Sequence, residues 1–75
     1  MSKATEDKIL ATIAKFWKEH GYGPQFREVT EAMGFRSTNT TRLYLNKLRA
    51  KNLVTWEAFK SRTLRLTSAD IHHRR

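Results

Sequence analysis

The stretch GFRSTNTTRLYLNKLRAKNL, residues 34–53, decides how the rest of the chain is interpreted. It opens with a glycine turn, and the hydroxyl of Ser37 is placed to cap a following helix. Leu45 and Leu48 lie three residues apart with Thr41 one turn before Leu45, so these side chains share one helical face. The opposite face carries polar and basic groups with one leucine: Asn39, Thr40, Arg42, Leu43 and Lys47. Such a helix is expected to press against a polar, negatively charged partner, for which DNA is the natural candidate.

Length and composition restrict the class of protein. A chain of 75 residues makes one domain, near the lower size limit for folding without covalent or metal crosslinks. It has no cysteine, so neither a disulfide nor a thiolate metal site can add stability, and a compact helical core or oligomerisation is expected instead. No apolar run approaches the ~18 residues of a membrane span, and no signal-peptide pattern opens the chain. These features predict a cytoplasmic, nucleoid-associated protein with no membrane contact.

The net charge of +8 is unevenly distributed. Residues 1–35 contain five basic and five acidic side chains, whereas residues 36–75 contain ten basic and two acidic ones. A merely solubilising surface would spread this charge along the chain. The asymmetry therefore favours one face that meets a polyanion.

Two helices are expected before the decisive stretch. The first begins near Thr5, with Glu6 and Asp7 in its first turn, and ends at Gly21. Its apolar stripe is expected to be core, although the aromatic members could in principle stack on bases: Ile9, Leu10, Ile13, Phe16 and Trp17.

After the loop at residues 21–24, a short helix over residues 25–33 buries Phe26, Val29 and either Ala32 or Met33. Its outward positions are Arg27, Glu28 and Glu31. The short turn through Gly34, with Phe35 beneath it, then predicts a helix-turn-helix.

Beyond Asn52 the pattern changes to alternation. Val54, Trp56 and Ala58 share one side of a first strand, and Leu64 and Leu66 share one side of a returning strand. A basic loop at residues 59–62 joins them, so this hairpin is expected to form a wing. The predicted fold is mainly α with a small β-hairpin, a three-helix winged helix-turn-helix over residues 1–67. A basic flexible tail is expected at residues 68–75.

The geometry of a helix-turn-helix nominates the DNA contacts. The N-terminal residues of its second helix lie nearest the base edges, where Asn pairs with adenine, Arg with guanine and Leu with a thymine methyl. The expected base-reading residues are Ser37, Thr38, Asn39, Thr40, Arg42 and Leu43. The expected contacts to the DNA backbone are Arg36, Lys47, Arg49, Lys51, Lys60 and Arg62. The last two, at the wing tip, are expected to meet either a flanking phosphate or the minor groove. Each basic residue alone is equally well explained as a solvated surface charge, and only their joint placement favours DNA.

Catalysis is not expected. The carboxylates Glu6, Asp7, Glu19, Glu28 and Glu31 are predicted to be exposed, and none is spaced with a histidine and a nucleophile. His20 at a helix end is interpreted as a cation near the negative end of the helix dipole. His72 and His73 in the tail are a weak metal candidate, and no glycine-rich phosphate loop is present. The chain is predicted to be no enzyme, with no cofactor, metal or small-molecule ligand.

These residues resemble the N-terminal DNA-binding domain of the LexA repressor family. The resemblance covers roughly residues 8–67 and rests on HGYGP (20–24), REVTEAMGFRSTN (27–39) and SRTLRL (61–66), of which GFRS followed two positions on by Asn is the specific part. It implies a winged helix-turn-helix whose third helix reads an operator. Ser37 and Asn39 match the family's contact residues, whereas Thr40, Arg42 and Leu43 stand where the family has a small apolar residue and two acidic ones. The resemblance therefore implies a different operator, or a related one with altered tolerance.

The family's self-cleaving serine–lysine protease domain, which also dimerises the protein, has no counterpart in these residues. The chain is thus expected to be a domain of a longer protein, or a small free-standing phage or mobile-element protein controlled by abundance or a partner. Trp56 and Phe59 are candidates for a small dimer contact, although Trp56 is better explained as closing the domain's own core.

The leading hypothesis is a sequence-specific double-stranded DNA-binding protein, a transcriptional repressor or regulator, bound as a homodimer on paired half-sites. The alternative is an adaptor that uses a winged helix to bind a host regulator or polymerase. Coating of DNA without sequence preference predicts the same charge. RNA is less favoured, because its major groove is too deep and narrow for a protruding helix.

Overall fold

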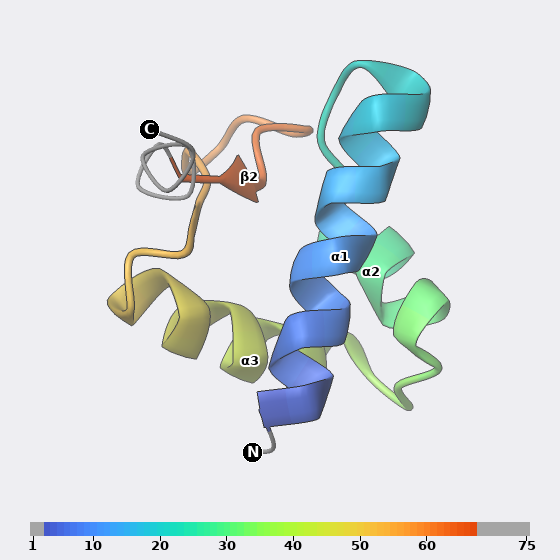
Figure 1. Ribbon diagram of the computed structural model, residues 1–75, viewed down its shortest axis with the longest axis vertical. Helices are drawn as coiled ribbons and strands as arrows, with labels where there is room; N and C mark the ends of the chain where they lie inside the picture. The colour runs from blue at the N-terminus through green and yellow to red at the C-terminus, as the bar shows by residue number, and fades with distance from the viewer. Residues whose placement is uncertain (1–2, 68–75) are drawn as a thin grey trace.

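The computed structural model describes residues 3–67, which form three helices followed by a two-stranded antiparallel hairpin (Figure 1). The elements are α1 (Lys3–His20), α2 (Phe26–Met33), α3 (Thr38–Ala50), β1 (Val54–Thr55) and β2 (Arg65–Leu66). The predicted fold class, three helices with a small hairpin, is confirmed. The domain limits stay a prediction, and the tail predicted at residues 68–75 lies outside the described residues.

One apolar core joins all of these elements. In Figure 1, α1 runs through the middle of the molecule and α2 lies along one side of it. α3 crosses near the N-terminal end of α1, and the hairpin lies beside the C-terminal half of α1. The innermost side chains come from every helix, from β1 and from the residue just before β2: Ile9, Ile13, Val29, Leu45, Leu48, Val54 and Leu64. Trp17 and Phe16 are half-buried, with Trp17 packed against this core, so the interpretation of Trp17 as core is confirmed.

The helix ends follow local chemistry with small shifts from the prediction. α1 begins at Lys3, two residues before the predicted Thr5, and ends at the predicted place, where Gly21 has φ +78° and donates its N–H to the Trp17 carbonyl at 2.8 Å. α2 begins at Phe26 because Gln25 is its N-cap. The Glu28 carboxylate accepts the Gln25 N–H at 2.8 Å, which satisfies a donor that the helix leaves unpaired.

The turn between α2 and α3 passes through Gly34, as predicted. Gly34 has φ +74° and donates its N–H to Glu31, and Phe35 donates its N–H to the Thr30 carbonyl at 3.1 Å. The Phe35 ring stacks on Tyr44 with centroids 5.5 Å apart, which confirms that it fills the space beneath the turn. Of the two alternatives in α2, Met33 packs on the core and Ala32 is exposed.

A buried hydroxyl pair also ties α2 to α3. Thr30 and Thr41 lie in hydrogen-bond contact inside the protein, and Thr30 in turn donates to the Phe26 carbonyl at 2.8 Å. Because each buried hydroxyl has a partner, this polar contact fixes the relative position of the two helices without leaving an unsatisfied group.

The hairpin is shorter than the alternation predicted. Val54 pairs with Leu66 and Thr55 with Arg65, and Ala58, expected on the buried side, is exposed because the chain leaves the strand after Thr55. Trp56 is half-buried, and its ring meets Phe26 edge-on at 5.2 Å. This confirms that Trp56 packs on the domain's own core.

Candidate nucleic-acid interface

The outer face of α3 gathers the predicted base-reading residues on its first two turns. The core-facing side chains Thr41, Leu45 and Leu48 are fully buried, as predicted. Their burial turns the remaining positions outward, and these are exposed: Ser37, Thr38, Asn39, Arg42 and Leu43. Thr40, predicted to face outward, is half-buried at the edge of this surface. The face combines amide, guanidinium and hydroxyl groups with the half-exposed Leu43, which is the mixture that base edges and a thymine methyl require.

Ser37 occupies the predicted N-cap position of α3, but not with the predicted bond. Its backbone is extended, with φ −146° and ψ 155°, as a cap requires, yet its side chain makes no capping hydrogen bond. The hydroxyl is exposed at the start of the helix. It is therefore available at the end of the helix that lies nearest to DNA in a helix-turn-helix complex.

Three of the predicted basic residues, on α3 or just before it, are exposed and form no salt bridge in the described part of the chain: Arg36, Arg42 and Lys47. The guanidinium groups of Arg36 and Arg42 are therefore free to bind phosphate or a guanine edge. Lys47 lies close enough to Glu6 for its charge to help lower the pKa of that carboxyl.

Arg49 and Lys51, predicted to contact the DNA backbone, are instead engaged with the protein. The Arg49 guanidinium lies 4.3 Å from the centroid of the Trp56 ring and donates to the Trp56 carbonyl at 3.2 Å. Lys51 pairs with Glu6 at 2.8 Å, which joins the C-terminal end of α3 to the first turns of α1. These contacts position the helix, and a phosphate contact by either residue stays a prediction.

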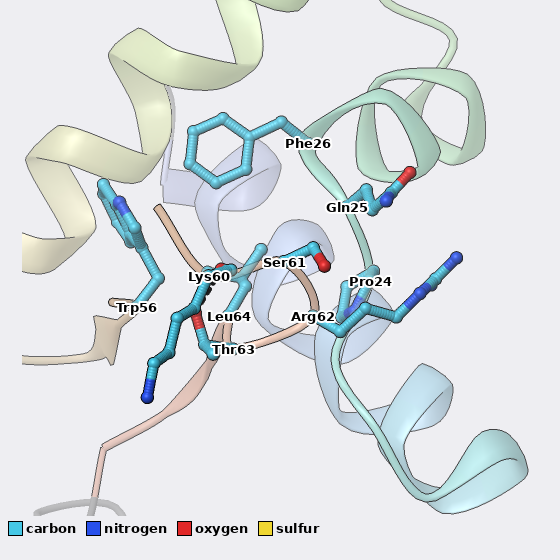
Figure 2. Close-up of a pocket in the computed structure, with 9 residues that line it drawn as sticks. All are labelled: Pro24, Gln25, Phe26, Trp56, Lys60, Ser61, Arg62, Thr63 and Leu64. Atoms are coloured by element: carbon cyan, nitrogen blue, oxygen red, sulfur yellow. Dashed lines mark hydrogen bonds between the residues drawn. The ribbon is translucent and has the colours of Figure 1, made fainter. Parts of the chain in front are cut away.

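Arg62, also predicted to contact the DNA backbone, is likewise engaged with the protein. Its guanidinium pairs with both oxygens of Glu28, at 2.7 and 3.3 Å, and lies 4.8 Å from the centroid of the Tyr22 ring. The backbone adds to this clamp, because the Gly23 N–H donates to the Arg62 carbonyl at 3.3 Å. Figure 2 shows Arg62 and Lys60 leaving the wing in different directions. Arg62 therefore anchors the wing to α2 and to the loop before it, and a phosphate contact by this residue stays a prediction.

Two carboxylates predicted to be exposed are not. The Glu6 side chain is only 7% exposed, and a hydrogen bond from Lys51 lowers the pKa of its carboxyl. Glu28 is half-buried, and its pKa is lowered first by the Gln25 backbone N–H and then by Arg62. Both carboxylates are thereby held in their charged form, as their ion pairs with Lys51 and Arg62 require.

The wing loop projects beside α2. Lys60 is 70% exposed and only loosely paired with Glu57, at 3.6 Å. A pocket of about 250 Å³ separates this loop from Trp56 and the start of α2 (Figure 2). Phe59, the residue before Lys60, is fully exposed.

His20 lies in the last turn of α1, at the predicted helix end, and its role as a cation near the helix dipole stays a prediction. Its ring packs at a tilt against two aromatic neighbours. The centroid distances are 4.3 Å to Phe16 and 5.6 Å to Tyr22. His20 thus belongs to the aromatic cluster on which Arg62 rests.

Sequence reasoning missed the residues that hold this surface in place. The pairs Glu6–Lys51 and Glu28–Arg62 carried no linear signal, whereas the spacing of Gln25 and Glu28 could have indicated a capping interaction. Within residues 3–67, no group of three or more histidine or acidic side chains is placed to hold a metal ion. No helix in the described part of the chain is long and apolar enough to cross a bilayer.

Comparison with known proteins agrees with this geometry. The family model described as the LexA DNA binding domain matches residues 1–63. LexA repressors of Lacticaseibacillus casei and Acetivibrio thermocellus are 40% and 38% identical over 62 and 61 residues, which is 83% and 81% of this chain but 30% and 29% of those proteins. The LexA repressor of Anaeromyxobacter dehalogenans is 40% identical over 62 residues, 83% of this chain and 27% of its own length. The chain thus spans less than a third of these relatives. By its match over residues 1–63 and its identity to these repressors, it belongs to the LexA DNA-binding domain family.

Proposed function

We propose that this chain binds double-stranded DNA in a sequence-dependent manner and acts as a transcriptional repressor. α3 would enter the major groove, and the wing would lie along the flanking backbone. The observation that carries the proposal is the outer face of α3, where Asn39 and Arg42 are exposed without an internal ionic partner while the opposite stripe is fully buried. The fold leaves this face outward, and the family match supports DNA as its partner.

The proposal divides the polar residues by what they touch. Asn39, Arg42 and Leu43 would read bases, with Ser37 and Thr38 completing the contact at the start of the helix. Arg36, Lys47 and Lys60 would bind phosphate. The residues already held by ion pairs or by Trp56 would instead keep α3 and the wing in place: Arg49, Lys51 and Arg62.

One small domain reads only a few base pairs. Typical specific complexes bury about 1,000–2,500 Å² of protein surface, whereas a single module buries about 600–1,000 Å². Tight binding therefore calls for two copies on paired half-sites about one helical turn apart. Such a function places the chain in the cytoplasm, at the nucleoid.

The test begins with selection of bound duplexes from a randomised library, followed by titration of the selected and a scrambled duplex across salt concentration. A defined motif bound about 10³-fold more tightly than the scrambled duplex is the expected result. A steep salt dependence with no enriched motif would show binding by charge alone. No binding to either duplex would favour a protein partner and contradict the proposal.

Two variants assign the roles. Asn39→Ala should reduce the preference for the selected duplex, whereas Lys47→Ala should weaken both duplexes alike and lower the salt slope by about 1. Lys15→Ala, the same change at an exposed site on α1, is the matched control and should alter neither quantity. Equal losses on both duplexes for Asn39→Ala would remove it from the base-reading set.

A further inference from the structure

The tip of the wing presents an aromatic side chain that the protein itself does not use. Phe59 is fully exposed, and its backbone has φ +67°. For a bulky residue this left-handed conformation is a rare and strained state. A strained backbone that supports no packing is typical of a residue kept for contact with a ligand.

Local geometry shows that glycine would suit this position better. The Lys60 N–H donates to the Glu57 carbonyl at 3.3 Å, so Phe59 is the third residue of a four-residue turn. A positive φ at that position alone is the pattern of a type II turn, which favours glycine or asparagine there. The Thr63 hydroxyl stiffens the loop, because it accepts the Glu57 N–H at 2.9 Å and contacts the Lys60 carbonyl at 3.1 Å. The loop therefore holds Phe59 outward in one place.

The surroundings of Phe59 fit DNA better than a protein surface. Its neighbours Glu57, Ala58, Lys60 and Ser61 are all exposed, so no apolar patch surrounds it. One aromatic side chain buries about 150–250 Å², whereas a stable protein interface needs about 1,000 Å² or more. A single apolar wedge beside a cation is, however, sufficient to occupy one base step of a minor groove.

We propose that Phe59 inserts into the minor groove next to the base pairs covered by α3 and wedges against a base step, while Lys60 binds the adjoining phosphate. This inference rests on the proposed function and adds a second reading element to it. Because pyrimidine–purine steps unstack most easily, the wing should favour a TA or CA step at its position. Specificity would then extend beyond the bases that α3 touches.

The decisive variant is Phe59→Gly, because it removes the ring and relieves the backbone at the same time. It should bind the selected duplex about 10-fold more weakly, within the range of one base–aromatic contact, while its thermal midpoint stays equal to or above that of the parent chain. A loss of affinity without a loss of stability cannot result from misfolding. Phe59→Ala, which keeps the strain, should lose the same affinity.

Asn52→Gly is the matched control, since Asn52 also has a positive φ, of 62°, but lies between α3 and β1 and not in the loop at residues 57–63. It should leave the affinity unchanged. A second readout uses 2-aminopurine placed in the flanking step of the duplex. Its fluorescence should rise on binding of the parent chain and stay low with Phe59→Gly.

Each alternative outcome is distinct. If the parent chain prefers the selected duplex and Phe59→Gly binds it equally well, the wedge is wrong and the proposed function stands. If the parent chain shows no preference for any duplex, the proposed function fails and the inference fails with it. If Phe59→Gly instead abolishes self-association of the free chain in sedimentation, and its affinity per half-site is unchanged, Phe59 contacts a second copy and not DNA.

Discussion

Gly23 lies where the loop before α2 meets the wing, and a single methyl group there should separate the two. A Cβ on Gly23 would lie 2.2 Å from the Leu64 carbonyl oxygen and 3.1 Å from both the Arg62 carbonyl oxygen and the Leu64 nitrogen. All three are backbone atoms, so no side chain can turn aside to make room. Gly23→Ala therefore requires the backbone near Leu64 to move by about 1 Å.

The free-energy cost of that movement has two parts, overpacking and the loss of a hydrogen bond. Overpacking of this kind costs about 1–3 kcal/mol. The displaced segment also accepts the Trp17 Nε1–H at the Leu64 carbonyl, at 2.8 Å, and a lost hydrogen bond adds about 0.5–1.5 kcal/mol. A total of about 2–4 kcal/mol is a large part of the stability of so small a domain, roughly 5 kcal/mol. At about 4–8 °C for each kcal/mol, the thermal midpoint should fall by about 8–32 °C.

The assay is thermal and urea unfolding of Gly23→Ala beside Gly21→Ala. Gly21 has φ +78° with no heavy atom within 4 Å of the added Cβ, so its substitution tests backbone strain alone and should cost about 1–2 kcal/mol. If Gly23→Ala destabilises the chain no more than Gly21→Ala does, the close contact between this loop and the wing is wrong.

Two further predictions concern buried polar contacts. The pKa of the Glu6 carboxyl is lowered by its hydrogen bond from Lys51, so the stability that this pair contributes is present above pH 4.5 and is lost as pH falls through the lowered value. Lys51→Met should therefore lose less stability on acidification than the parent chain, measured by urea unfolding at neutral and acid pH; an unchanged acid sensitivity would exclude the pair as its source. In the second case Thr30→Val should cost about 1–3 kcal/mol, because it leaves the buried Thr41 hydroxyl without its partner. Thr41→Val should cost less than about 1 kcal/mol, since Thr30 still donates to Phe26, and the reverse order of the two urea midpoints would refute this assignment.

The helices and their inward faces could be predicted because the signals are local. The spacing of Thr41, Leu45 and Leu48 indicated the buried stripe of α3, and the glycines at positions 21 and 34 indicated the turns that the structure shows. The exposed half of the candidate site follows from the same periodicity, since burying one stripe turns the other face outward.

The contacts that orient the site could not be predicted in this way. Glu6 and Lys51 are 45 residues apart, and Glu28 and Arg62 are 34 apart, so each pair is created by tertiary packing alone. Sequence reasoning treated these four residues as separate surface charges, two of which, Lys51 and Arg62, it assigned to the DNA backbone, and did not predict that they pair within the protein. The positive φ of Phe59 could not be predicted from its residue type either. The turn that imposes this conformation is held by a hydrogen bond between main-chain atoms, from the Lys60 N–H to the Glu57 carbonyl.

One face of α3 is required for folding, and the other is not. Thr41, Leu45 and Leu48 keep the helix in the fold, whereas Asn39, Arg42 and Leu43 contribute nothing to the core. Substitutions at such exposed positions usually change stability by no more than about 0.5 kcal/mol. Under the proposed function, the outer residues can therefore be exchanged during evolution or by design, and a new operator preference can arise while the domain that presents it stays intact.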